Sequence, residues 1–420
     1  MGLKIQNGRI IDAANNLDFV GDIYIQNGKI VAFNDAPLNF QTDEIIDATN
    51  QIVCAGFVDL SVRLQNVTKE ADVAASSGVT SFCVQPDIKP IIDTPEVVKH
   101  LKDSAKSAQV HFIGALTQKL EGNELSSMLS LKKAGCIAVS NGNFPVKNLL
   151  ILRRAMEYAA SHDLLFIYRP NEFSLSNGGC AHEGAVATRY GLPSIPEAAE
   201  TIALEQCLEL AELTGCRVHF GQLSSKRAVI KLQQAKKYGL NVSADVAIHQ
   251  LHLSENNIVP FDSNYHVLPP FRSDEDREFL RAGLLNGTVD AICSDHQPHS
   301  LDAKLAAFPE TKAGVSSLET LLPLLLKLVN ENVIDLAQGL ALLNAKPATI
   351  LGLKTGSLAI DSPADICIFD PNLEWQVNTE NWKSDGINTP FWNQTLKGRV
   401  TQTIQAGKII FENSVTASFF

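Results

Sequence analysis

Two side chains at the end of a buried strand limit the chemistry that this sequence can support. Apolar residues fill most of residues 56–65, and Ser61 and Arg63 lie two positions apart, so both point to the same face. In a hydrolase built on a parallel barrel, such a pair faces the reaction centre, where two histidines would bind a divalent metal. A hydroxyl and a guanidinium cannot replace them, because arginine stays protonated and offers no lone pair. We therefore expect no metal ligand from this strand.

The other predicted strand ends carry few metal ligands. Hydrolytic metal sites need several imidazoles and carboxylates that converge on one point. The clearest ligand is Asp295, after the eighth strand, and one carboxylate cannot hold zinc alone. The other strands end in mostly amide, hydroxyl, aromatic or guanidinium groups, at Asp87, Thr117, Asn141, Tyr168, Arg169, Gln222, His249 and Gln250.

The composition is that of an ordinary globular protein. The 420 residues are 45% hydrophobic and 19% charged, and the net charge of −11 argues against nucleic-acid or anionic-membrane partners. No signal peptide pattern or membrane-spanning apolar run is visible. The eight cysteines contain no C-x-x-C pair. We expect a cytoplasmic protein with reduced, buried thiols, Cys54, Cys83 and Cys293 serving as small apolar fillers.

The two chain ends share a pattern of short alternating strands. Segments around Asn7-Gly8 and Asn27-Gly28 predict hairpin turns, and residues 364–370 and 400–410 show similar strand patterns. We predict a small composite β-sandwich domain from residues 1–55 plus 355–420.

Between these ends, residues 56–354 alternate between strands and helices such as 195–214 and 227–238. This rhythm predicts a (β/α)8 TIM-type barrel, an α/β fold. A doubly wound open sheet is the weaker alternative, because no glycine-rich phosphate fingerprint follows the first strand. The predicted strands are 57–62, 79–84, 111–116, 136–140, 164–168, 217–223, 241–247 and 290–295.

A series of short motifs resembles the dihydroorotase family of the amidohydrolase superfamily along nearly the whole chain. The resemblance implies the barrel with an appended β-domain, and ring closure of carbamoyl aspartate to dihydroorotate by a zinc-bound hydroxide. The motifs begin at Ala55-Gly56-Phe57-Val58-Asp59-Leu60, Gln85-Pro86-Asp87, Ile113-Gly114-Ala115-Leu116-Thr117, Ala181-His182-Glu183-Gly184, Val267-Leu268-Pro269-Pro270, Ser294-Asp295-His296-Gln297-Pro298-His299 and Gly314-Val315-Ser316-Ser317.

The departures from the family pattern fall where that chemistry occurs. By resemblance, five metal-ligand positions are replaced, at Ser61, Arg63, Asn141, Tyr168 and Gln222. Three substrate positions are also changed, at Gln65, Asp87 and Leu268, and Asp87 would repel a carboxylate substrate. Of the catalytic set only Asp295 and His299 remain, as vestigial candidates for the base and for a substrate contact.

The resemblance therefore favours a pseudoenzyme of pyrimidine biosynthesis, with no catalytic residues and no cofactor. Family members of this degenerate kind occur alongside aspartate carbamoyltransferase, whose assembly they support, so we expect its catalytic chains as partners in a homo- or hetero-oligomer. The alternative is an active dihydroorotase or related cyclic amidohydrolase that uses Asp295 in an altered or metal-free site. A vacated pocket could also bind an anion through Arg63, Arg169 and Gln222.

Several polar residues have simpler structural interpretations. We expect Asp295 to be a structural carboxylate paired with Arg63, and His299 to be a loop histidine bonded to a carbonyl. His219 lies within a predicted strand, where a packed core imidazole is the usual case. His249 and His252 are three positions apart and could bind adventitious metal, but a surface loop explains them equally well.

Overall fold

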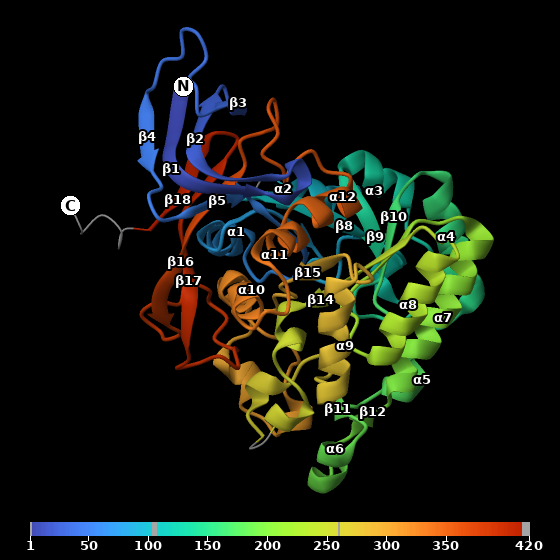
Figure 1. The fold of residues 1–420 in the computed structure, drawn as a ribbon. Helices are drawn as coiled ribbons and strands as arrows, with labels where there is room; N and C mark the ends of the chain where they lie inside the picture. The colour runs from blue at the N-terminus through green and yellow to red at the C-terminus, as the bar shows by residue number, and fades with distance from the viewer. Residues whose placement is uncertain (1, 103–106, 259–260, 414–420) are drawn as a thin grey trace.

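A ring of eight parallel strands forms the centre of the computed structural model, which describes residues 2–102, 107–258 and 261–413 (Figure 1). Each strand is bonded to the next in chain order, as predicted for a barrel. The strands are β6 (Phe57–Val62), β7 (Val79–Val84), β8 (Gln109–Ala115), β9 (Cys136–Ser140), β10 (Leu165–Tyr168), β13 (Val218–Phe220), β14 (Val242–Ala247) and β15 (Ala291–Cys293).

Helices pack around the outside of this ring and carry its second layer of apolar side chains. Inside the ring lie small and branched residues such as Val58, Leu60, Cys83 and Ile113, all buried. The helices are α1 (Val67–Ser76), α2 (Pro95–Lys102), α3 (Met128–Ala134), α4 (Leu149–Ser161), α7 (Glu197–Thr214), α8 (Lys226–Lys237), α9 (Asp274–Leu285), α10 (Leu321–Asn330), α11 (Leu336–Leu343) and α12 (Ala345–Leu351). No helix in the described part of the chain has the length and hydropathy that a membrane span requires.

Buried polar bonds close the ring between β6 and β15. Val62 and His296 form a parallel bridge, with the Arg63 amide donating to the His296 carbonyl over 2.8 Å. The Asp59 carboxylate, only 1% exposed, accepts bonds from the Ser294 amide at 3.0 Å and from the Ser294 hydroxyl. The His296 Nε2 lies 2.9 Å from the carboxylate of Glu70 on α1. The first and last barrel strands are thus joined mainly by side chains, because their backbone ladder is short.

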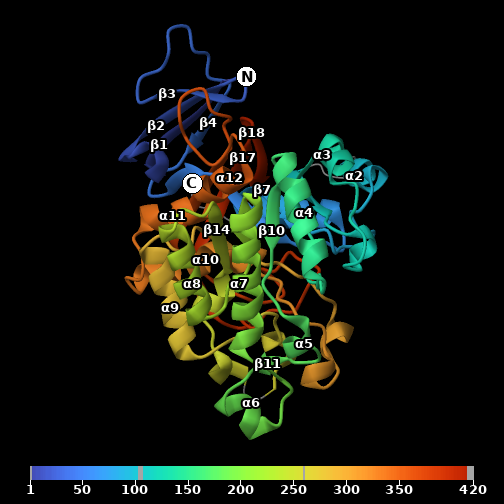
Figure 2. The same ribbon diagram turned by 90° about the vertical axis from the view of Figure 1, so that its right-hand side faces the viewer.

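Both chain ends meet in a second, mixed sheet at one end of the barrel (Figures 1 and 2). The sequence predicts a β-sandwich from these strands, but their hydrogen bonds join them into one continuous sheet. The join is made by β5, which pairs with β1 on one side and with β16 on the other. The strands are β1 (Gly2–Asp12), β2 (Leu17–Gln26), β3 (Lys29–Phe33), β4 (Glu44–Asp47), β5 (Ile52–Ala55), β16 (Ile366–Gln376), β17 (Thr395–Gln405) and β18 (Lys408–Glu412).

One of the two predicted Asn-Gly turns is wrong. Asn27-Gly28 does connect β2 to β3, but Asn7-Gly8 lies inside β1, where the register with β2 shifts by one residue. Asn7 has a φ of +63°, and its amide donates to the Asp22 carboxylate at 3.1 Å. The left-handed residue therefore forms a β-bulge, which bends the strand without ending it.

The opposite end of the barrel carries long connections that surround its mouth. The connection after β10 contains α5 (Phe173–Ser176), β11 (Ala181–His182), α6 (Ala185–Tyr190) and β12 (Ser194–Ile195), at the bottom of both views (Figure 2). The connection after β14 contains short 3-10 turns, the first of which is η3 (Ile248–Leu251). These segments place side chains over the carboxyl ends of the strands, where barrel enzymes hold their reacting groups.

The closure of the ring makes stability depend on the protonation of Asp59. Burial raises the pKa of Asp59 from 3.8 to about 6, so the folded protein binds its proton more tightly than the unfolded chain does. The stability that the protonated form contributes is therefore lost as pH rises from about 4 through 6, by about 3 kcal/mol. In Asp59→Asn this loss should disappear. Urea unfolding of both proteins from pH 4 to 7 measures it, and parallel pH profiles would contradict the assignment.

Candidate functional site

The guanidinium of Arg63 lies between two buried carboxylates at the barrel mouth. Its Nε and Nη2 donate to the two oxygens of Asp87 at 3.0 Å each, and its Nη1 donates to Asp295 Oδ1 at 3.2 Å. The Asp87 and Asp295 side chains are only 4% and 5% exposed, and that of Arg63 is 13% exposed. The predicted pair of Arg63 with Asp295 is confirmed. The two-pronged contact with Asp87 is the stronger one, because two N–H groups face one carboxylate.

The Asp295 carboxylate accepts three side-chain hydrogen bonds at the mouth. Its Oδ1 also accepts a bond from the Ser61 hydroxyl at 3.1 Å, and its Oδ2 accepts one from the Gln297 amide at 3.1 Å. Its backbone adopts a left-handed φ of +48°, which costs about 1 kcal/mol for a non-glycine residue. These bonds hold the Asp295 carboxylate beside Arg63, and its role as a structural carboxylate stays a prediction.

Asp87 is held equally firmly, and its predicted role needs correction. The Asp87 carboxylate accepts a bond from the Asn143 backbone N–H at 3.0 Å in addition to those from Arg63. Gly142, with φ at +57°, lets this loop approach, because a Cβ there would lie 2.6 Å from the Asp87 carboxyl carbon. Asp87 is therefore a neutralised partner of Arg63 and not a free charge facing a substrate.

A second arginine completes a balanced set of charges. The Asn143 side-chain oxygen accepts one bond from Arg63 Nη2 at 2.9 Å and another from Arg169 Nη1. Burial lowers the pKa of Arg169 to about 10, so its charge remains at neutral pH. Burial also opposes the charge of Arg63, but Asp87 and Asp295 outweigh it and raise the pKa of Arg63. Two cations and two anions thus face one another with no net charge.

Three of the predicted ligand positions lie outside this network. Tyr168 packs on the outer face of the barrel, where its ring lies 6.4 Å from that of Phe220, so its placement at a ligand position is wrong. The neighbouring Arg169 faces the mouth instead. Asn141 accepts two bonds from Thr117 and donates to the Phe144 carbonyl, which ties down its own loop. Gln222 is buried inside the barrel, and its backbone N–H donates to the Asp245 carboxylate.

The histidines have mostly structural partners. His299 Nε2 lies 2.9 Å from the Ala313 carbonyl, and His219 is fully buried between Ser243 and Asp245, as expected for both. The surface-loop interpretation of His249 and His252 is wrong. His249 is 2% exposed and packs edge-on against Phe271, and burial lowers the pKa values of both rings, to about 4 and about 3. All eight cysteines are free and buried, as predicted.

Two cavities lined by described residues at the mouth are small. One cavity at the mouth, lined by Asn141, Asn143 and Arg169, has a volume of about 20 Å³. A second, lined by Arg169, Leu268 and Arg272, has about 50 Å³. Pockets for small organic ligands usually enclose about 300–1,000 Å³. Gln65, at a substrate position by resemblance, turns away to donate to the Pro298 carbonyl at 2.9 Å.

The side chains at the mouth do not fit a hydrolytic zinc site. Among the residues that the structure describes, no three histidine, cysteine, aspartate or glutamate side chains converge to hold a metal ion. Zinc would need three or four such donors at about 2.0–2.3 Å. The two carboxylates that face each other here already bind a guanidinium, which occupies the space between them.

Comparison with known proteins gives relatives of nearly full length. A family model described as "Dihydro-orotase-like" matches residues 50–228. A "Dihydroorotase-like protein" of Pseudomonas aeruginosa is 43% identical, covering 98% of this chain and 100% of the relative. A "Dihydroorotase-like protein" of Pseudomonas putida is 41% identical (97% and 99%), and a "Dihydroorotase" of Syntrophus aciditrophicus is 36% identical (98% and 100%).

Solved structures share the fold at lower identity. An L-hydantoinase from Arthrobacter aurescens superposes with a TM-score of 0.86 at 22% identity, over 98% of this chain and 96% of that one. A dihydropyrimidinase from Brevibacillus agri gives 0.83 at 20% identity, over 98% and 95%. These similarities establish the barrel with its appended sheet, and no more than the fold.

The balance of charges at the mouth predicts a large effect of removing its central cation. Arg63→Ala should lower the free energy of unfolding by about 3–5 kcal/mol, because two buried carboxylates lose their partner. Adding Asp87→Asn and Asp295→Asn to this variant should recover part of the loss. Urea denaturation measures both effects.

Arg9 provides the matched control, since its ion pair with Asp18 is about half exposed on both sides. Arg9→Ala should cost less than about 1 kcal/mol. If Arg63→Ala costs no more than Arg9→Ala, the mouth does not depend on the guanidinium.

Proposed function

We propose, from the premise that this chain belongs to the dihydroorotase-like family of the amidohydrolase superfamily, that it is a non-catalytic member and an assembly partner of aspartate carbamoyltransferase catalytic chains. The observation that carries the proposal is the position of Arg63. Its guanidinium is bonded to Asp87 and Asp295 at the mouth, where an active relative would hold its metal.

The remaining groups supply no substitute for metal activation of water. Zinc in a hydrolase lowers the pKa of its bound water to about 7, far below the pKa of bulk water. A base at Asp295 would have to remove that proton unaided, but its oxygens already accept bonds from Ser61, Arg63 and Gln297. His299 is turned to the Ala313 carbonyl. None of these groups is free to act on a substrate amide.

The intact fold supports a role in which the chain binds a partner protein through its surface. The barrel closure through Asp59 and His296 is intact, and the second sheet is built from both chain ends. A scaffold of this size with a filled mouth suits a protein that presents a surface to a partner. The choice of aspartate carbamoyltransferase as the partner follows the family resemblance alone, and the two relatives named "Dihydroorotase-like protein" support only membership of the family.

A second candidate function is a cyclic amidohydrolase with a rearranged site. The relative named "Dihydroorotase", at 36% identity over nearly the whole chain, favours it. In that case Arg63 would have to leave the two carboxylates and open space for a substrate. Activity without bound metal, or with a metal on Asp295, would support this alternative.

Zinc content and turnover separate the two candidate functions. Protein expressed with excess zinc should contain less than about 0.1 zinc per chain by mass spectrometry, because no three ligands converge. The same preparation should hydrolyse dihydroorotate no faster than buffer. A catalytic dihydroorotase purified in parallel serves as the control. Stoichiometric zinc together with turnover would establish the second candidate instead.

Co-expression tests the proposed assembly with aspartate carbamoyltransferase. When the chain is co-expressed with the aspartate carbamoyltransferase catalytic chains of the same organism, the two should elute as one complex in size-exclusion chromatography. The catalytic chains alone, and the same chains mixed with an unrelated barrel protein, are the controls. Separate elution at micromolar concentration would contradict the proposed partnership while leaving the absence of catalysis unaffected.

A further inference from the structure

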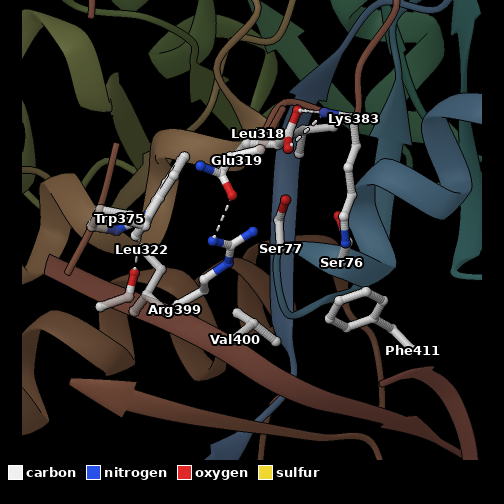
Figure 3. A pocket seen from close by; sticks show the side chains of 13 residues that line it. Ser76, Ser77, Leu318, Glu319, Leu322, Trp375, Lys383, Arg399, Val400 and Phe411 are labelled. Atoms are coloured by element: carbon white, nitrogen blue, oxygen red, sulfur yellow. Dashed lines mark hydrogen bonds between the residues drawn. The ribbon is translucent and has the colours of Figure 1, made fainter. Parts of the chain in front are cut away.

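The seam between the barrel and the second sheet contains two spaces of different character. The smaller lies between α10 and β17 and has a volume of about 30 Å³ (Figure 3). There Arg399 donates to the Asn381 side chain at 3.1 Å and lies over the Trp375 ring, so neutral groups already satisfy it. The larger space is a groove of about 700 Å³ beside β8, within the range of small-molecule sites.

The larger groove is positive in an acidic protein. Among the described residues that line it are three lysines, Lys102, Lys354 and Lys408, and one carboxylate, Asp365. These residues carry three positive charges and one negative charge, on a chain of net charge −11. Asp365 is already engaged, since it accepts bonds from the Thr355 hydroxyl at 2.7 Å and from the Ala406 amide at 2.8 Å. Lys102 donates to the Ala134 carbonyl at 2.7 Å, whereas Lys354 and Lys408 form no ion pair with a carboxylate in the part of the chain that the structure describes.

A buried histidine in the lining adds a hydrogen-bonding group with no partner. His111, on β8, is 9% exposed, and its Nε2 has no bond within the described residues. Burial, with a smaller effect of the Lys102 charge, lowers its pKa to about 4, so the ring is neutral at pH 7. An unpaired polar atom at this depth costs about 1–3 kcal/mol. A ligand atom recovers this cost when the His111 ring turns toward the groove, because its Nε2 is fully buried in the present position.

Apolar side chains also line the groove. Val110, Leu353, Pro363 and Ile410 line the groove between the lysines. A site with apolar walls and a few placed polar groups is typical of pockets for small organic molecules. Inorganic ions alone would leave these walls uncovered.

We propose that this groove binds a small organic anion, a phosphate or carboxylate carried on a flat ring. Lys354 and Lys408 face the anionic group, the ring covers Val110 and Leu353, and the His111 imidazole bonds a polar atom of the ring. The groove lies at the end of the barrel opposite the mouth, so the inference holds whether or not the mouth is catalytic.

Phenyl phosphate is the probe that matches this chemistry, and calorimetric titration of the full chain tests it. We expect a Kd of about 1 mM or lower, about tenfold weaker binding of inorganic phosphate, and no measurable binding of benzyl alcohol. In Lys354→Met/Lys408→Met the affinity for phenyl phosphate should fall about tenfold. Absence of binding, or equal affinity for phenyl phosphate and inorganic phosphate, would overturn the proposal.

A control variant separates the groove from general attraction between charges. Lys312→Met/Lys397→Met removes the same charge from two lysines that do not line the groove, and it should leave the affinity within about twofold. An equal loss in both double variants would identify an adventitious ion effect only and reject the site. The imidazole nitrogen resonances of His111, assigned with His111→Phe, should shift on titration in the native chain. Binding without that shift would contradict the proposed pose.

Discussion

A buried cation held by two buried carboxylates is the constraint on which the barrel mouth depends. A carboxylate or a guanidinium alone at this depth would cost several kcal/mol of desolvation, and only their mutual contacts offset it. Asp87 and Asp295 follow different strands, so Arg63 ties together the ends of β6, β7 and β15. A divalent metal could make the same connections, but a guanidinium makes them with directed hydrogen bonds and leaves no open position for water.

The polar groups that shape the barrel are separate from those that would react. Asp59 and Ser294 join the first and last strands, and His296 connects them to Glu70 on the first helix. The side chains of these groups are buried, and none of the side-chain bonds that join them involves the Arg63 guanidinium. The scaffold can therefore retain its closure while the groups above it change, which fits a chain whose fold matches hydantoinases and whose mouth does not resemble a metal site.

The strand pattern predicted the barrel because parallel strands buried on both sides are continuous apolar runs, and all eight were found within a few residues of their bounds. Local patterns were less reliable. Asn7-Gly8 has the residues of a hairpin turn, but it forms a bulge because β1 continues along β2 and β5. Likewise, the position of Tyr168 suggested the mouth, whereas the inside-outside alternation along β10 directs its ring outward.

The charge network was only half predictable. Arg63 and Asp295 could be paired because both follow strands whose ends meet at the mouth, but Asp87 was interpreted by resemblance alone, as a changed substrate contact. Two features of the sequence could have placed Asp87 in this network: its charge is opposite to that of Arg63, and it follows β7, the strand next to β6. Asn143 gave none, because a loop amide acquires its role only from the path of the chain around Gly142.

If a guanidinium, and not a metal, is the cation of this barrel mouth, Arg63 keeps its place when zinc is in excess. X-ray diffraction from crystals grown with excess zinc, recorded on both sides of the zinc absorption edge, tests it most directly. We expect electron density for Arg63 between Asp87 and Asp295 and no anomalous peak at that place. An anomalous peak beside Asp295, with the Arg63 side chain displaced, would contradict it.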